Sequence, residues 1–249
     1  MSQDVKSGKI LSPSTPWTER GVPGIQVPDE QTSLKATFTE PTIECPECHA
    51  LVTRTAMSFN AYVCPQCDEH LRMKARDRLN WFFDQVQTEL GQEFKAKDPL
   101  KFVDSKPYPA RMSEAQTKTG ETEALVVMQG LLKGIPLIAC AFEFDFMGGS
   151  MGTVVGDRFV QAAEKAIADK QPLICFAASG GARMQEGLLS LMQMARTAAA
   201  IERLRIAGVP YIVVLTNPVY GGVTASLAML GDIHLAEPKA MIGFAGKRV

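Results

Sequence analysis

Apolar residues in the second half of the chain form runs that predict strands and helices in alternation. Two β-rich runs, over residues 125–132 and 135–146, are separated only by a Lys-Gly pair, which predicts a hairpin. Residues 157–170 then carry apolar residues at helical spacing, and residues 172–178 form a short, wholly apolar run. A helix followed by a strand that is buried on both faces explains this pattern.

The unit of helix and buried strand repeats along the rest of the chain. The pattern predicts a long helix over 183–207, a strand over 210–216, a short helix over 225–230 and a strand over 233–236. Such alternation implies crossover connections and a mostly parallel sheet with helices packed on it in layers. We therefore expect an α/β fold for this half of the chain.

The N-terminal part of the chain has a different composition. Residues 1–40 are rich in Pro, Gly and polar residues and lack apolar periodicity, so they predict a flexible tail. Residues 70–86 place apolar side chains at helical spacing and basic side chains on the other sides, which predicts an amphipathic helix with a basic face. Prolines within 98–109 predict a linker. We expect a tail over 1–40, a small domain over 41–80 and a larger domain over 81–249.

Four of the six cysteines form two CxxC pairs with fifteen residues between them. These cysteines are Cys45, Cys48, Cys64 and Cys67. This is the spacing of a four-cysteine zinc ribbon, in which each pair directs two thiolates at one tetrahedral ion. We expect one structural Zn²⁺ per chain rather than four unrelated thiols, with a hairpin of residues 51–53 and 61–63 between the pairs. His49 and His70 flank the pairs and are expected to lie in solvent.

Glycine-rich segments follow three of the predicted strands, at residues 147–152, 179–183 and 220–223. Small residues at the junction of a strand and a helix leave backbone N–H groups unhindered, and such groups bind negative charge. This is the chemistry of an oxyanion hole. The segments lack the GxGxxG, GxxxxGK[ST] and GxSxG motifs, so they do not indicate a dinucleotide site, a P-loop or a serine nucleophile.

These segments contain no evident general base. The three histidines, His49, His70 and His234, lie outside them, which argues against a His-based triad. Glu186 and Asp157 each lie one turn into a predicted helix, where capping or an ion pair explains a carboxylate without catalysis. We therefore expect the base to arrive with a substrate or cofactor.

Composition narrows the functional classes. The 249 residues are 46% apolar and carry 26 basic against 27 acidic side chains, and a formal charge of −1 gives no general attraction to nucleic acid or membranes. The N-terminus resembles no signal peptide and no apolar run approaches a membrane span, so we expect a cytoplasmic protein. Nucleic-acid binding by the ribbon stays open, because zinc ribbons often contact nucleic acid.

Together, these motifs resemble the β subunits of bacterial, multi-subunit acetyl-CoA carboxylase carboxyltransferases. The resemblance covers residues 41–249 and rests on the two CxxC pairs and six further motifs. The six are FMGGSMGTVVG (146–156), ASGGARMQEG (178–187), SLMQM (190–194), GGVTAS (221–226), AMLGD (228–232) and IGFAG (242–246). A set of this size is far more specific than any single motif.

The resemblance implies a crotonase-like fold, layered from ββα units, preceded by a small zinc ribbon. It implies transfer of a carboxyl group from carboxybiotin, on a biotin carboxyl carrier protein, to acetyl-CoA, giving malonyl-CoA for fatty-acid synthesis. The implied partners are a carboxyltransferase α subunit in an α2β2 assembly, the carrier protein and a separate biotin carboxylase that uses ATP. The family continues beyond Val249, so we expect a chain shortened at its C-terminus and active only with the α subunit.

The resemblance also suggests site residues. Crotonase relatives stabilise an enolate oxygen with two backbone N–H groups from two loops, and the matching positions here are Gly180, Gly181, Ala182, Gly221 and Gly222. The basic cluster nearest the ribbon, which we expect to contact CoA phosphates unless it is a solvated helix face, is Arg72, Lys74, Arg76 and Arg78. The alternatives are a carboxyltransferase or decarboxylase for another acyl-CoA and, in another class, a zinc-ribbon nucleic-acid-binding protein.

Overall fold

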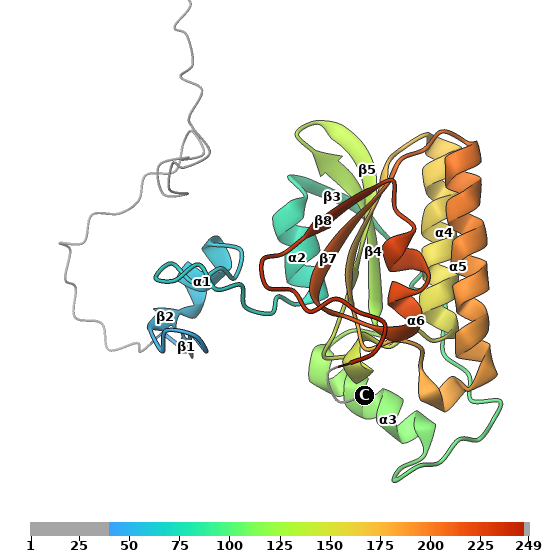
Figure 1. Ribbon diagram of the computed structural model, residues 1–249, viewed down its shortest axis with the longest axis horizontal. Helices are drawn as coiled ribbons and strands as arrows, with labels where there is room; N and C mark the ends of the chain where they lie inside the picture. Colours follow the sequence, from blue (N-terminus) through green and yellow to red (C-terminus); the bar gives the residue numbers. More distant parts are fainter. Residues whose placement is uncertain (1–39, 247–249) are drawn as a thin grey trace, which may run out of the picture. The chain divides into compact units, whose positions relative to one another are not determined.

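The computed structural model describes residues 40–246 and contains a six-stranded sheet with helices on both faces (Figure 1). The strands lie in the sheet in chain order. They are β3 Gln85–Leu90, β4 Leu125–Leu132, β5 Ile135–Phe142, β6 Leu173–Ser179, β7 Tyr211–Val219 and β8 Ile233–Ala236. The tail predicted over 1–40 lies outside the described residues except for its last residue.

The predicted hairpin and the parallel strands are confirmed. β4 and β5 pair antiparallel with Leu132 opposite Ile135, as the two-residue turn between them requires. From β5 to β8 every neighbouring pair is parallel. Each parallel step needs a crossover, and the helices α4 (Thr153–Asp169) and α5 (Leu188–Ile206) lie in the first two. The carboxyl ends of β5, β6 and β7 therefore lie at one edge of the sheet.

Alternating side chains of β4 separate the interior into two layers. Leu125 and Val127 belong to the larger apolar cluster, which includes residues of α4 and α5, whereas Val126 and Met128 belong to a smaller cluster beneath α2 (Ala75–Phe82). Figure 1 shows α2 on one face of the sheet and the α4/α5 pair on the other. Burial on both faces explains why β6 is apolar throughout.

Two N-terminal predictions are wrong in extent. The helix predicted over 70–86 is limited to α2, and the residues after it form the edge strand β3, which pairs with β4. The segment predicted as a linker contains the start of α3 (Tyr108–Thr119), with a proline in its first turn. Proline is tolerated there because the first N–H groups of a helix have no helical acceptor.

The C-terminal helices are also divided differently from the prediction. The 3-10 turn η3 (Met184–Glu186) precedes α5, and Gly187 separates the two. In place of one helix over 225–230, the structure has α6 (Gly221–Thr224) and the 3-10 turn η4 (Leu227–Met229). No helix within residues 40–246 is long and apolar enough to cross a membrane.

The cysteine segment contains a two-stranded sheet and a short helix. β1 (Thr42–Glu44) pairs antiparallel with β2 (Leu51–Thr53), and α1 (Arg54–Phe59) follows directly. The predicted pairing of residues 51–53 with 61–63 is therefore wrong. Ala61 and Tyr62 have φ values of 51° and 60°, and this left-handed backbone conformation cannot continue a strand.

Candidate active site

The three glycine-rich segments meet where the parallel strands end. Loop A (147–152), which begins with the 3-10 turn η2 (Met147–Gly149), comes after β5; loop B (179–183) begins at the last residue of β6; loop C (220–223) comes directly after β7. Ligands of open α/β sheets bind at this edge, outside the carboxyl ends of the strands. The structure therefore brings together the three segments that the sequence predicts to bind negative charge.

Backbone hydrogen bonds fasten the loops to one another. Met151 N in loop A donates to Gly181 O in loop B at 2.8 Å, and Arg183 N donates back to Met151 O at 2.9 Å. Tyr220 N in loop C donates to Ser179 O at 2.8 Å. These bonds make loop B the centre of the arrangement.

Loops B and C approach each other most closely at a glycine pair. Gly181 has a φ of 121°, in the region that favours glycine. A Cβ placed on Gly181 would lie 3.2 Å from Gly221 Cα and 3.3 Å from Gly222 N. Any side chain at position 181 would therefore crowd the backbone of loop C.

Of the five amides predicted as donors, three already have an acceptor within the part of the chain that the structure describes. These three, Gly180, Gly181 and Gly221, donate to Gly148 O at 2.8 Å, to Ser179 Oγ at 3.0 Å and to Phe244 O at 2.9 Å, respectively. Within residues 40–246, no acceptor lies within hydrogen-bond distance of the N–H groups of Ala182 and Gly222. A Cβ on Gly222 would lie 3.5 Å from Ala182 N, so the two free amides are close neighbours.

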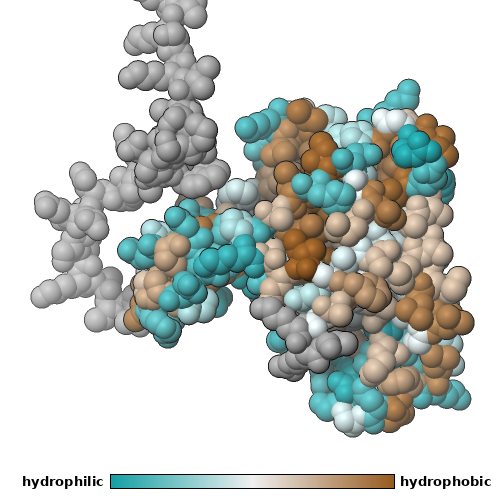
Figure 2. Space-filling view, in the orientation of Figure 1, coloured by the Kyte–Doolittle hydropathy of each residue, from teal (hydrophilic) through white to brown (hydrophobic). Residues whose placement is uncertain are grey.

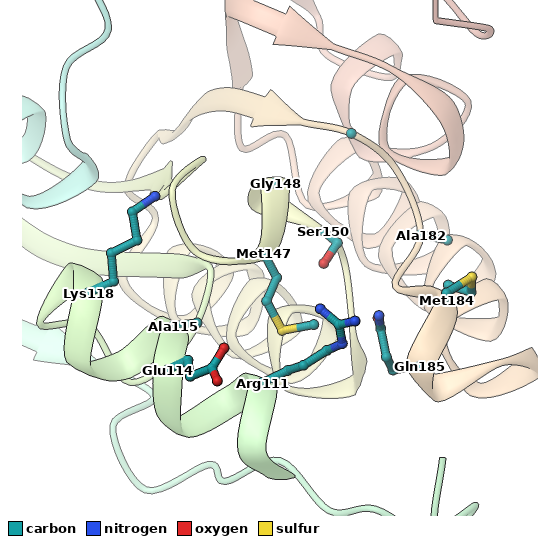
Figure 3. Close-up of a pocket in the computed structure, with 11 residues that line it drawn as sticks. Arg111, Glu114, Ala115, Lys118, Met147, Gly148, Ser150, Ala182, Met184 and Gln185 are labelled. Atoms are coloured by element: carbon teal, nitrogen blue, oxygen red, sulfur yellow. The ribbon is translucent and has the colours of Figure 1, made fainter. Parts of the chain in front are cut away.

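A cavity of about 510 Å³ opens beside loop B. Figure 3 shows loop B and the turn after it on one side, with Ala182, Met184 and Gln185, and α3 on the other. The lining residues are Arg111, Glu114, Ala115, Lys118, Met147, Gly148, Ser150, Gly180, Ala182, Met184 and Gln185. The free amide of Ala182 thus belongs to a residue that lines a cavity large enough for a small acyl group.

The charged residues of this cavity come from α3, and the sequence patterns described above did not predict this helix. Arg111 is paired with Asp104 at 2.6 Å, and Glu114 with Lys106 at 2.6 Å. A signal for α3 was present, because Tyr108, Met112, Ala115 and Thr119 have helical spacing and are all buried. No histidine is among the described residues that line the cavity.

Beneath loop B lies a buried cluster of charged groups. The Arg183 guanidinium donates to Glu123 Oε1 at 2.5 Å and Oε2 at 2.8 Å, and its side chain is fully buried. The hydroxyl of Tyr108 donates to Glu186 Oε1 at 2.6 Å. Burial alone would lower the pKa of Arg183, but the negative charge of Glu123 outweighs it and raises that pKa. Burial raises the pKa of Tyr108, so its hydroxyl keeps its proton and donates.

The four cysteines of the CxxC pairs form one cluster. Their sulfur atoms all lie within 4.8 Å of one another, with Cys45 and Cys67 separated by 3.6 Å and Cys48 and Cys64 by 3.7 Å. Four thiolates at about 2.3 Å from a tetrahedral ion would be separated by about 3.8 Å. The donor set and its spacing therefore fit a metal ion of the kind that thiolates bind.

The predicted basic face divides into two groups. Arg76 is held by Glu89 and Glu121, both at 2.7 Å, and Arg78 is held by Glu237 at 2.7 Å. Arg72 and Lys74 precede α2 rather than lying within it. Arg72 stacks over the Phe144 ring at 4.3 Å and is 3.9 Å from Asp145.

Arg72 and Arg78 line a second cavity, of about 470 Å³, together with the aromatic rings of Phe144 and Phe176. Its lining also includes Ala178, two residues before Gly180 in the lining of the first cavity. Residues at the end of β6 therefore contribute to the lining of both cavities.

Solved structures share this fold. Transcarboxylase 12S with hydrolysed methylmalonyl-coenzyme A bound matches 71% of this chain at 30% identity with a TM-score of 0.57, and the match covers 32% of that protein. A Pseudomonas malonate decarboxylase heterodimer matches 71% of this chain at 26% identity with a TM-score of 0.53, over 67% of its own chain. The predicted crotonase-like α/β fold is confirmed.

Sequence comparison agrees with the fold. Residues 98–249 match the carboxyl transferase domain family. Over all 249 residues the chain is 85% identical to the acetyl-coenzyme A carboxylase carboxyl transferase subunit beta of Acinetobacter baumannii, and it spans 84% of that protein. As the motifs predict, the chain is a carboxyl transferase subunit and belongs to the family of acetyl-coenzyme A carboxylase carboxyl transferase β subunits.

Proposed function

We propose that this chain, assembled with a carboxyltransferase α subunit, transfers a carboxyl group from carboxybiotin to acetyl-CoA and forms malonyl-CoA. The observation that carries this proposal is the pair of neighbouring free amides, Ala182 in loop B and Gly222 in loop C. Ala182 lines a cavity that has no histidine among its described residues. Such a site stabilises negative charge on an oxygen but does not itself remove a proton.

The proposed reaction needs no base from this chain. The substrate carboxybiotin supplies both CO₂, when its N–C bond breaks, and a nitrogen that accepts a proton from the acetyl methyl group. The methyl carbon then forms the new C–C bond with CO₂. In this proposal Ala182 and Gly222 hold the thioester oxygen while it carries the negative charge of the enolate, and each donor is worth about 3 kcal/mol of transition-state stabilisation.

We place the thioester in the cavity beside Ala182 and the CoA moiety toward the second cavity. Among the four basic residues predicted to contact CoA phosphates, Arg72 is the best placed. It lines the second cavity, and its nearest carboxylate is 3.9 Å away. Arg76 and Arg78 each pair with a carboxylate at 2.7 Å. Because that carboxylate offsets the positive charge of the guanidinium, these two arginines would attract a phosphate less strongly. Among residues 40–246, no carboxylate lies within 4.0 Å of the Lys74 ammonium, so Lys74 is free for the same role.

The partners we propose are the α subunit in an α2β2 assembly, a biotin carboxyl carrier protein and a biotin carboxylase that uses ATP, all in the cytoplasm. Exposed apolar side chains at the start of α5 support a partner surface, since Leu188 is 69% exposed and Leu191 and Met192 are each 50% exposed. Figure 2 shows hydrophobic patches on the face of the molecule that it presents. We assign Zn²⁺ to the cysteine cluster as a structural ion, because four thiolates leave no open position.

The test is malonyl-CoA formation by the assembled complex with Gly222→Ala. A Cβ at position 222 would lie near Ala182 N and Met194 Sδ, so we expect kcat to fall by about a hundredfold while the KM for acetyl-CoA changes little. Gly246→Ala is the matched control, because a Cβ there meets no atom within 4 Å among the described residues. An unchanged kcat for Gly222→Ala would reject the donor assignment, and activity only with another acyl-CoA would correct the substrate.

A further inference from the structure

We propose that the buried cluster of Arg183, Glu123, Glu186 and Tyr108, which we name the sub-loop network, positions the Ala182 amide for catalysis. The inference rests on the proposed function, because it concerns how one of the two donors is held. The network does not touch the thioester in this proposal. Its members are positioning residues that act through the backbone of loop B.

The network binds loop B to loop A through one side chain. Arg183 immediately follows Ala182, and its guanidinium donates to Ser150 O at 2.8 Å and to Ser150 Oγ at 3.1 Å. Its own N–H donates to Met151 O at 2.9 Å. Both the backbone and the side chain of Arg183 are therefore fastened to loop A, and the orientation of the Ala182 peptide depends on both attachments.

Two carboxylates and a phenol fix the guanidinium in turn. Glu123 accepts two hydrogen bonds from Arg183, and Tyr108 OH lies 3.1 Å from Arg183 Nη1 while donating to Glu186. Glu186 also accepts from Thr153 N, the first residue of α4, at 2.7 Å. The network thus joins α3, loop A, loop B and the start of α4, and the first three of these line the cavity.

Burial makes this arrangement sensitive to small changes. Arg183, Glu123 and Glu186 have side chains that are 0%, 1% and 1% exposed, so water cannot replace a lost partner. A buried charge with a missing partner costs free energy and drives local rearrangement. Misplacement of a catalytic group by about 1 Å is enough to cost about a hundredfold in rate.

The most informative variant is Tyr108→Phe, which removes one hydroxyl and keeps the ring in the core. We expect kcat for malonyl-CoA formation to fall by about tenfold or more, with little change in the KM for acetyl-CoA. We also expect faster amide hydrogen exchange in the peptide that contains Ala182, measured on the assembled complex without substrate. Glu123→Gln, which keeps the shape of the side chain and removes its charge, should lower kcat in the same way.

The matched control is Arg158→Lys. Arg158 is another arginine that is 1% exposed, and it donates to Gly91 O, Leu125 O and Thr122 Oγ1 but makes no hydrogen bond to the three loops or to the sub-loop network among the described residues. Lysine keeps its positive charge near Glu123. This substitution should lower the thermal midpoint and leave kcat per folded complex unchanged. If Tyr108→Phe behaves like Arg158→Lys, with a lower midpoint, normal kcat and normal exchange at Ala182, the network is only structural and the inference is overturned.

The two proposals fail in different ways. Absence of malonyl-CoA formation by the wild-type complex would overturn the proposed function, whatever Tyr108 does. A wild-type complex that is active and is impaired by Gly222→Ala, together with a fully active Tyr108→Phe, would overturn the network alone.

Discussion

The cysteine segment and the six-stranded sheet are held together by different forces. Within the segment from β1 to Cys67, the buried apolar residues are Val52, Met57 and two of the cysteines, Cys45 and Cys64. The sheet has two apolar clusters, one on each face, and the larger one contains residues of β4 to β7 and of several helices. A segment with so little apolar burial needs another source of stability, and the four sulfur atoms are placed to supply it by binding a metal.

The candidate active site belongs to the sheet region and not to the cysteine segment. The proposed donors, Ala182 and Gly222, follow strands of the sheet, so we expect their positions to depend on apolar burial and not on the metal. Ion pairs connect the sheet region to the cysteine segment and to the residues just after it: Lys239, which follows β8, lies 3.8 Å from Glu47 and 2.7 Å from Glu69. If the two regions are stabilised independently, a substitution in one should leave the stability of the other unchanged.

The largest effect is expected from loss of the metal. Structural zinc binds with an apparent free energy of about 10 kcal/mol or more, so Cys64→Ala should unfold the cysteine segment and expose it to protease, while the thermal transition of the sheet persists. Elemental analysis measures the metal content, limited proteolysis the unfolding of the cysteine segment, and calorimetry the thermal transition of the sheet. Cys175→Ala is the matched control, since Cys175 is equally buried but lies in β6 outside the cluster. A protease-resistant segment without metal would contradict the prediction.

A substitution in the apolar core should destabilise the sheet and leave the cysteine segment intact. Phe159 in α4 is fully buried and packs edge-on against Tyr211 with ring centroids 5.6 Å apart. Phe159→Ala should lower the free energy of unfolding of the sheet by about 3 to 5 kcal/mol, because it leaves a cavity. Denaturant titration followed by circular dichroism measures the loss. The metal content should stay at one ion per chain, and loss of the ion would show that the two regions are coupled.

A smaller effect is expected at the carboxylate pair around Arg76. Arg76→Gln leaves Glu89 and Glu121, which are 18% and 8% exposed, without their cation. We expect a loss of about 1 to 3 kcal/mol, because solvent reaches the 40% exposed Arg76 side chain but screens the two carboxylates poorly. Burial acts to raise the pKa of Glu89, but its bonds to Arg76 lower that pKa overall. The contribution is therefore present above the ordinary carboxyl pKa of 4.5 and is lost as pH falls through the lowered value. Wild type and variant should converge in stability at low pH, and a difference that persists there would contradict this account.

The smallest effect is expected at Lys239. Its side chain is 64% exposed, and it pairs with Glu69 at 2.7 Å and with Glu47 at 3.8 Å. Surface pairs of this kind contribute little, so Lys239→Ala should leave the thermal midpoint within experimental error. Differential scanning fluorimetry against wild type is sufficient. A loss as large as that of Arg76→Gln would mean that the contact couples the two regions.

The sequence predicts the sheet region better than the N-terminal part. β5 and β6 are apolar along nearly their whole length, because both are buried in the sheet, and α4 has apolar residues at helical spacing on its buried side. β3 is a polar edge strand with mostly exposed side chains, and nothing in its sequence distinguishes it from a loop or helix end. The prolines around Tyr108 predict a break in regular structure, but they lie at the N-cap and in the first turn of α3, where a helix accepts proline.

The candidate site was predictable in part. Local motifs identify loops B and C, since the need for small residues is visible in the sequence. Local motifs do not show which amides remain free, because that depends on acceptors such as Gly148 O and Phe244 O, which lie far along the chain. The partners of Arg183 were equally invisible, since Glu123 and Tyr108 are 60 and 75 residues away in sequence.

The placement of the two free amides after adjacent strands also affects how this protein is mapped by mutagenesis. β6 and β7 are neighbours in the sheet, and neighbouring strands lie about 4.8 Å apart, so the separation of loops B and C is set by the hydrogen bonds of the sheet. No side chain carries the proposed chemistry. An alanine scan would leave Ala182 untouched, and at Gly222 it would add a side chain without removing the N–H, so it would test the donors only indirectly. Replacement of single backbone amides by esters, which deletes an N–H and adds no side chain, is the form of mutagenesis suited to this site.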